Sequence, residues 1–101
     1  GRILQQKVLL RERRQKAIDN GESFSVPVKS LTGDQFFLNV IPENSIYDVK
    51  SFILEEIGVP ITQQRLICKG KQLENQYTLK DYGILDGSYP INIVLRLRGG
   101  L

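Results

Sequence analysis

The last seven residues of the chain carry its clearest chemical signature. They read Leu95-Arg96-Leu97-Arg98-Gly99-Gly100-Leu101. Two successive glycines have no side chain to obstruct them and take extended or twisted conformations at little steric cost. Such a segment suits a tail that threads a narrow enzyme slot and offers the carboxylate of Gly100 for activation. Because Leu101 follows Gly100, this chemistry requires removal of Leu101; otherwise the tail is a solvated basic segment of a longer chain.

The side chains needed for most catalysis are missing. The chain has no histidine and one cysteine, Cys68. Without histidine there is no Ser–His or Cys–His nucleophile pair and no usual general base near neutral pH, and most zinc sites are excluded. Cys68 would be a nucleophile assisted only by neighbouring Lys69, so a small hydrophobic residue at a strand end is the simpler interpretation. We expect a protein that is not an enzyme and that needs no cofactor or metal.

Length and composition indicate one small domain. A chain of 101 residues can bury a modest core without disulfides. No apolar run approaches the length of a membrane span, and no signal-peptide pattern opens the sequence. A single cysteine favours a reducing intracellular setting, in the cytoplasm, the nucleus or both.

The positive charge is concentrated in residues 1–22. The chain carries a net charge of +3, whereas residues 23–101 hold eight acidic and eight basic residues. Apolar residues within residues 2–18 recur at helical spacing and predict a short amphipathic helix; they are Ile3, Leu4, Val8, Leu10, Ala17 and Ile18. A helix of this length is marginal alone in water, so it either packs on something or frays. We therefore predict a basic helix or linker over residues 1–22 and a folded domain over residues 23–101.

The sequence patterns predict that the elements of the folded domain follow the order strand–strand–helix–strand–strand–strand. Apolar residues alternate over residues 24–28 and 36–40, which predicts a hairpin that turns near Gly33. Ser45 and Asp48 approximate a capping box at the start of a helix that ends at Gly58. Further strands are expected over residues 65–68, 72–73 and 91–96, with one tight helical turn over residues 78–83. This order is typical of an α+β domain in which one helix lies across one face of a mixed sheet.

Four internal segments match ubiquitin closely and in the same order. They are Val28–Gly33, Gln63–Ile67, Gly70–Glu74 and Thr78–Tyr82. With the tail, they make residues from about Phe24 to Gly100 resemble ubiquitin and the ubiquitin-like domain family, whereas residues 1–22 are unmatched. The resemblance implies the β-grasp fold, a mixed sheet of four or five strands packed on one α-helix.

The resemblance also implies a protein-binding patch. Its three aliphatic positions fall on Leu31, Ile67 and Val94, and its polar or cationic rim falls on Arg65, Lys71, Gln72, Asn92 and Arg96. Asn92 replaces the histidine of the family. Exposed aliphatic side chains that gather in one place usually mark a partner site, although single ones are ordinary. We expect weak binding, of about micromolar affinity, to ubiquitin-receptor-type proteins and ubiquitin-pathway enzymes.

Conjugation is the second function that the resemblance implies. In the family, the carboxylate of the terminal glycine is adenylated, passed to a cysteine as a thioester and joined to a lysine amine. The matching tail is Arg96, Leu97, Arg98, Gly99 and Gly100. The matching acceptor lysines are Lys29, Lys50 and Lys71.

One local departure from the family concerns Pro27. Pro27 stands inside the first strand and cannot donate a ladder hydrogen bond. The chain also gains one residue between Leu85 and Ile91 relative to ubiquitin. We hypothesise that this extra residue forms a bulge near residues 88–90, opposite Pro27.

Three functions remain open. The leading one is a ubiquitin-like interaction module, within or released from a longer protein. The second is a precursor of a conjugated modifier that is activated at Gly100 after removal of Leu101. The third is a nucleic-acid adaptor that uses the basic tail and helix. The basic segment lacks interleaved aromatic residues, which disfavours a nucleic-acid partner, and we expect a monomer.

Overall fold

The computed structural model describes residues 23–95 of the chain. The helix predicted within residues 2–18 and the tail residues Arg96, Leu97, Arg98, Gly99 and Gly100 lie outside the described residues. The described elements are β1 (Phe24–Ser30), β2 (Gln35–Val40), α2 (Ile46–Ile57), β3 (Gln64–Cys68), β4 (Lys71–Gln72) and β5 (Ile91–Leu95), with short 3₁₀ turns at Ile61–Gln63 and Lys80–Tyr82.

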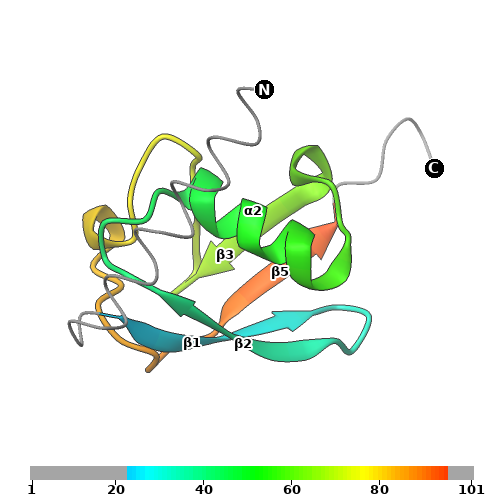
Figure 1. The fold of residues 1–101 in the computed structure, drawn as a ribbon, viewed down its shortest axis with the longest axis horizontal. Helices are drawn as coiled ribbons and strands as arrows, with labels where there is room; N and C mark the ends of the chain where they lie inside the picture. The colour runs from blue at the N-terminus through cyan, green and yellow to red at the C-terminus, as the bar shows by residue number, and fades with distance from the viewer. Residues whose placement is uncertain (1–22, 96–101) are drawn as a thin grey trace.

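The strands form one mixed sheet that packs on a single helix. The sheet has five strands in the order β2-β1-β5-β3-β4. β1 and β5 run parallel, whereas the other neighbouring strands are antiparallel. Figure 1 shows α2 lying across one face of this sheet. This arrangement confirms the predicted β-grasp fold.

Both ends of α2 are capped by the predicted residues. The Asp48 N–H donates to Ser45 Oγ at 3.0 Å, and the Ser45 N–H donates to Asp48 Oδ2 at 3.1 Å. Each bond satisfies a backbone donor that the first helical turn leaves without an intrahelical partner. At the other end, Gly58 is left-handed (φ 74°) and its N–H donates to Leu54 O at 2.9 Å. A residue with a Cβ would be strained at this φ, which explains the glycine.

One hydrophobic core lies between α2 and the sheet. Because side chains alternate along a strand, every second residue of each strand points at α2. The fully or almost fully buried set comprises Val26, Val28, Leu38, Val40, Ile46, Val49, Phe52, Ile53, Leu66, Cys68, Leu73, Leu79, Ile84, Ile91 and Ile93. Cys68 is therefore a core side chain, in agreement with its interpretation as a small hydrophobic residue.

The expected bulge opposite Pro27 is wrong. The parallel ladder between β1 and β5 begins at the pair Val28 and Ile91, one residue after Pro27, and continues without interruption to Ser30. Pro27 itself pairs only with Phe37 of β2. Neither Pro27 nor Pro90 has an N–H to donate, so the ladder begins immediately after both prolines.

Candidate functional site

The face of the sheet opposite α2 is not covered by any described element, and we call it the open face. Residues that pair across strands point to the same face. The pairing therefore places one row of open-face residues across all five strands, namely Gln35, Lys29, Asn92, Ile67 and Gln72. The neighbours of these residues along the strands, such as Val28, Leu66 and Ile93, point into the core.

Two of the three aliphatic residues named from the sequence, Ile67 and Val94, lie on the open face, and the third, Leu31, lies in the turn after β1. Val94 is two residues after Asn92 on β5 and pairs with Arg65, so it belongs to the next row. Leu31 directly follows Ser30 at the end of β1, where Ser30 pairs with Ile93. Leu31 is 82% exposed, and Ile67 and Val94 are half-buried. We call these three residues the aliphatic patch.

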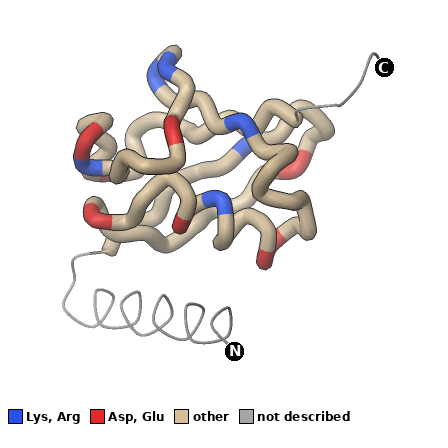
Figure 2. Tube along the Cα trace, turned by 90° about the horizontal axis from the view of Figure 1, so that it is seen from above, with Lys and Arg blue, Asp and Glu red and all other residues tan. Residues whose placement is uncertain are grey.

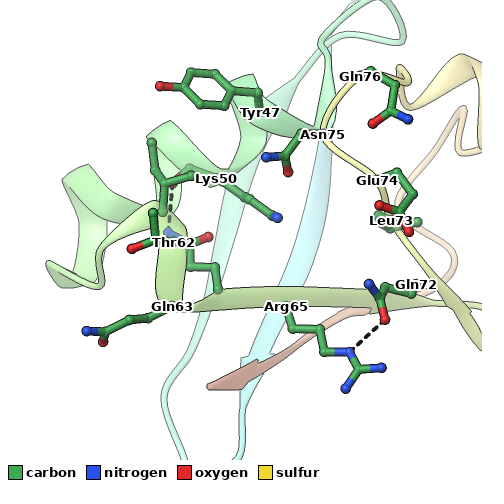
Figure 3. Close-up of a pocket in the computed structure, with 12 residues that line it drawn as sticks. Tyr47, Lys50, Thr62, Gln63, Arg65, Gln72, Leu73, Glu74, Asn75 and Gln76 are labelled. Atoms are coloured by element: carbon green, nitrogen blue, oxygen red, sulfur yellow. Dashed lines mark hydrogen bonds between the residues drawn. The ribbon is translucent and has the colours of Figure 1, made fainter. Parts of the chain in front are cut away.

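The rim of the aliphatic patch is polar and partly preorganised. Arg65 Nε donates to Gln72 Oε1 at 2.7 Å, which links neighbouring strands (Figure 3). Asn92 is exposed between Lys29 and Ile67. Lys71 is exposed on β4 but pairs with the core residue Cys68, so it does not belong to the open-face rows. Among the described strand residues that point away from α2, Lys29 and Arg65 are cationic and none is acidic. The rim therefore favours a partner surface that is neutral or acidic.

The candidate acceptor lysines differ in exposure. Lys29 and Lys71 are exposed, whereas Lys50 is only 8% exposed. Lys50 lies one turn after Ile46 and one turn before Ile53, so it borders the apolar stripe of α2. We therefore expect the folded domain to offer Lys50 to a conjugating enzyme less readily than Lys29 or Lys71. The helical spacing of Lys50 was the sequence signal that could have shown this.

A polar cleft lies between α2 and the β3–β4 region and was not expected from the sequence. Its volume is about 760 Å³, and residues from several separate segments line it. Figure 3 shows the Lys50 side chain extending into it, with Tyr47 on one side and Asn75 and Gln76 near its edge. At its base, Gln64 Nε2 donates to the carbonyl oxygens of Lys50 and Val59, each at 2.9 Å. The two bonds tie α2, the loop after it and β3 together.

The described residues show no constellation typical of catalysis. No group of three or more His, Cys, Asp or Glu residues within residues 23–95 could hold a metal ion. Burial raises the pKa of the Cys68 thiol, and the charge of Lys69 offsets only part of this effect. Cys68 is thus a protonated thiol in the core at neutral pH, which is the opposite of an activated nucleophile. No helix within these residues is both long and apolar enough to cross a membrane.

Comparison with known proteins agrees with the fold. The Ubiquitin family model matches residues 26–98. The chain is 37% identical over 75 residues to NEDD8-like protein RUB1 of Saccharomyces cerevisiae, which covers 74% of this chain and 96% of that protein. It is 40% identical over 76 residues to ubiquitin-like protein NEDD8 of Dictyostelium discoideum, an alignment that covers 75% of this chain and 97% of that protein. The fold thus defines a ubiquitin-like domain, and the chain belongs to the ubiquitin family.

Another relative carries such a domain within a much longer protein. The chain is 41% identical over 73 residues to AN1-type zinc finger protein 4 of Mus musculus, which covers 72% of this chain but 10% of that protein. The family therefore includes both small proteins that this chain matches over almost their whole length and larger proteins that contain the domain as one part.

Proposed function

We propose that this chain is a ubiquitin-like interaction module that binds partner proteins through the aliphatic patch. The proposal is supported by the positions of Ile67 and Val94 in neighbouring rows of the open face, and by the 82% exposure of Leu31 just after β1. Contact with a partner would remove their remaining exposed apolar area from water, at about 25 cal/mol per Å². The partners are ubiquitin-receptor-type proteins and ubiquitin-pathway enzymes, and the setting is the cytoplasm or the nucleus.

The rim supports this proposal in two ways. The hydrogen bond between Arg65 and Gln72 holds both side chains in place before a partner arrives, which lowers the entropy lost on binding. Asn92 can donate and accept hydrogen bonds but does not titrate near neutral pH. Binding through this surface should therefore vary little between pH 5 and pH 8 on account of the domain itself.

Titration of the chain with a ubiquitin-receptor domain, followed by calorimetry, tests the proposal. We expect Ile67→Ala and Val94→Ala to weaken binding about tenfold each, because core residues of a small interface carry most of its affinity. Glu55→Ala on the exposed side of α2 is the matched control and should leave the affinity unchanged.

The neighbouring core residue supplies a second control. Leu66 is fully buried, so Leu66→Ala should cost about 2–5 kcal/mol of unfolding free energy. Ile67→Ala should cost clearly less, because Ile67 points to the opposite face. An Ile67→Ala variant that binds normally, or that loses as much stability as Leu66→Ala, would contradict the proposal.

We also propose a second function, as a conjugated modifier activated at Gly100. Its support is the match to NEDD8-type proteins over nearly their whole length, together with the tail sequence of residues 95–100. In this reaction the Gly100 carboxylate displaces pyrophosphate from ATP, and the acyl group passes to an enzyme cysteine with release of AMP. A lysine amine then displaces the thiol. Lys29 and Lys71 are the exposed acceptors for a further copy.

Incubation with an activating enzyme and ATP distinguishes the two functions. The chain should be prepared in one form that ends at Gly100 and another that ends at Leu101. A thiol-sensitive adduct with the Gly100 form alone would support the modifier. Absence of an adduct with both forms would exclude activation and leave the interaction module. The nucleic-acid alternative has no support within the described residues. Residues 23–95 contain eight acidic and six basic residues, and the two signs are interspersed along the chain (Figure 2).

A further inference from the structure

Two tyrosines and one carboxylate line a small cavity beside the start of α2. The cavity has a volume of about 330 Å³ and is lined by Tyr77, Asp81 and Tyr82. Two of these residues belong to the 3₁₀ turn Lys80–Tyr82. The Ile46 N–H donates to the Tyr77 carbonyl oxygen at 2.8 Å, which fixes this segment to the first residue of α2. The cavity therefore belongs to the α2 side of the domain and not to the open face.

The two tyrosine rings meet almost at a right angle. The ring centroids of Tyr77 and Tyr82 are 5.9 Å apart, and the ring planes are inclined by 79°. Such an edge-to-face pair is a favourable arrangement of aromatic rings, whose faces are electron-rich. Two planes at this angle enclose a corner between their faces. Ring faces of this kind attract cations, most often the guanidinium of arginine.

One wall of this corner is fixed, whereas the other is open to solvent. The Glu74 N–H donates to the hydroxyl oxygen of Tyr82 at 2.8 Å, and Tyr82 also packs against the hydrophobic core. Tyr77 is 46% exposed. The corner is thus preorganised by Tyr82 and can be reached from water beside Tyr77, which lowers the entropy lost when a ligand enters.

Asp81 adds a negative charge to the corner. The Thr78 N–H donates to Asp81 Oδ2 at 2.9 Å, and the Asp81 N–H donates to Thr78 Oγ1 at 3.1 Å. These two bonds hold the carboxylate in place. Within residues 23–95, Asp81 Oδ1 accepts no hydrogen bond and no lysine or arginine forms an ion pair with Asp81. One oxygen of a fixed carboxylate is therefore available to an external donor.

We propose that the corner formed by Tyr77, Tyr82 and Asp81 binds the guanidinium of an arginine side chain on a partner protein. The planar guanidinium stacks on a tyrosine ring while its N–H groups donate to Asp81 Oδ1. A lysine ammonium is a more strongly hydrated point charge and fits ring faces less well. Occupation of this site leaves the aliphatic patch accessible, and the inference does not depend on the function proposed for that patch.

An NMR titration of the full chain with a blocked glycine–arginine–glycine tripeptide tests this binding. A single side chain binds weakly, with a Kd on the order of millimolar, which such titrations measure. We expect the amide shifts that change to lie within residues 74–83. Citrulline, the neutral analogue of arginine, should abolish these changes, and lysine in the same position should raise the Kd at least about threefold.

Variants of the cavity separate the contribution of the rings from that of the charge. Tyr77→Ala and Asp81→Asn should each raise the Kd for the arginine peptide at least about fivefold. Asparagine keeps an oxygen that can accept from the Thr78 N–H, so the turn is retained. Tyr77→Phe should bind like the unmodified chain, because the ring makes the contact. Tyr47→Ala is the matched control, since Tyr47 is 49% exposed on α2 and lines the other cleft.

Unaltered amide shifts in β3 and β5 show that each variant is folded. Equal affinity for the arginine and citrulline peptides would overturn the proposal, because the charge would then contribute nothing. Equal affinity of Tyr77→Ala and the unmodified chain would overturn the role of the rings, and lysine bound as tightly as arginine would overturn the choice of guanidinium. Shift changes that lie outside residues 74–83 would place the peptide elsewhere and would also contradict the proposal.

Discussion

Gly87 and Ser25 meet backbone against backbone where the loop before β5 passes β1. A Cβ added at Gly87 would overlap the backbone oxygen of Ser25. Backbone cannot move aside as a flexible side chain can, so Gly87→Ala must displace either the loop or β1. We expect a loss of about 1–3 kcal/mol in unfolding free energy, as in other overpacked sites, measured by urea denaturation.

Ser88→Ala is the control for Gly87→Ala. It alters the next residue, which is exposed, and should change stability by no more than about 0.5 kcal/mol. Equal stability of the Gly87→Ala variant and the unmodified chain would show that the loop can relax away from Ser25.

The capping box of α2 makes a second prediction. Ser45→Ala removes the acceptor for the Asp48 N–H and should cost about 1 kcal/mol, within the usual range for such caps. Ser51→Ala is a useful comparison within the same helix, because Ser51 Oγ donates only to the Tyr47 carbonyl oxygen. That change should be neutral or slightly stabilising, since alanine is the better helix former. Thermal unfolding of both variants measures the difference, and equal effects would disprove the role of the cap.

The buried thiol of Cys68 predicts a pH dependence of stability. Burial raises its pKa in the folded state above the value in the unfolded chain. The folded state therefore holds the thiol proton more tightly than the unfolded chain does. The resulting contribution to the free energy of unfolding is complete below the ordinary thiol pKa of about 8.5. It is lost as the pH rises through that value and through the higher folded pKa.

Comparison with Cys68→Ala isolates this contribution from other groups that titrate at alkaline pH. The stability advantage of the unmodified chain over Cys68→Ala should shrink between pH 7 and pH 10, in urea denaturation at each pH. A difference that stays constant over this range would mean that the thiol titrates alike in both states. Slow alkylation of Cys68 in the folded chain at neutral pH, and fast alkylation in urea, should accompany the result.

The exposure of the lysines predicts their reactivity. Acetylation of the folded chain with a limiting amount of an amine-reactive ester should modify Lys29 and Lys71 at least about tenfold faster than Lys50, because Lys50 reacts only when the structure opens locally. Peptide mass spectrometry gives the rates, and the same reaction in urea is the control. Equal rates for the three lysines in the folded chain would contradict the expectation that Lys50 is the least accessible of them.

Local sequence determined the elements of this protein and much of its family assignment. The alternation of Phe24, Val26 and Val28 predicts a strand, and Ser45, Asp48 and Gly58 predict the ends of a helix. These signals act between residues within a few positions of one another, because turns, caps and side-chain alternation depend on local backbone geometry. They were sufficient to predict the fold correctly, together with the resemblance of residues 24–100 to ubiquitin.

Only the tertiary structure decided how distant segments meet. The register between β1 and β5 places Lys29 beside Asn92, and the approach of the loop to β1 requires glycine at position 87. The same assembly created the cleft beside α2 and left Phe37 facing solvent. These features depend on strand pairing and core packing between residues far apart in the chain, which local patterns do not encode.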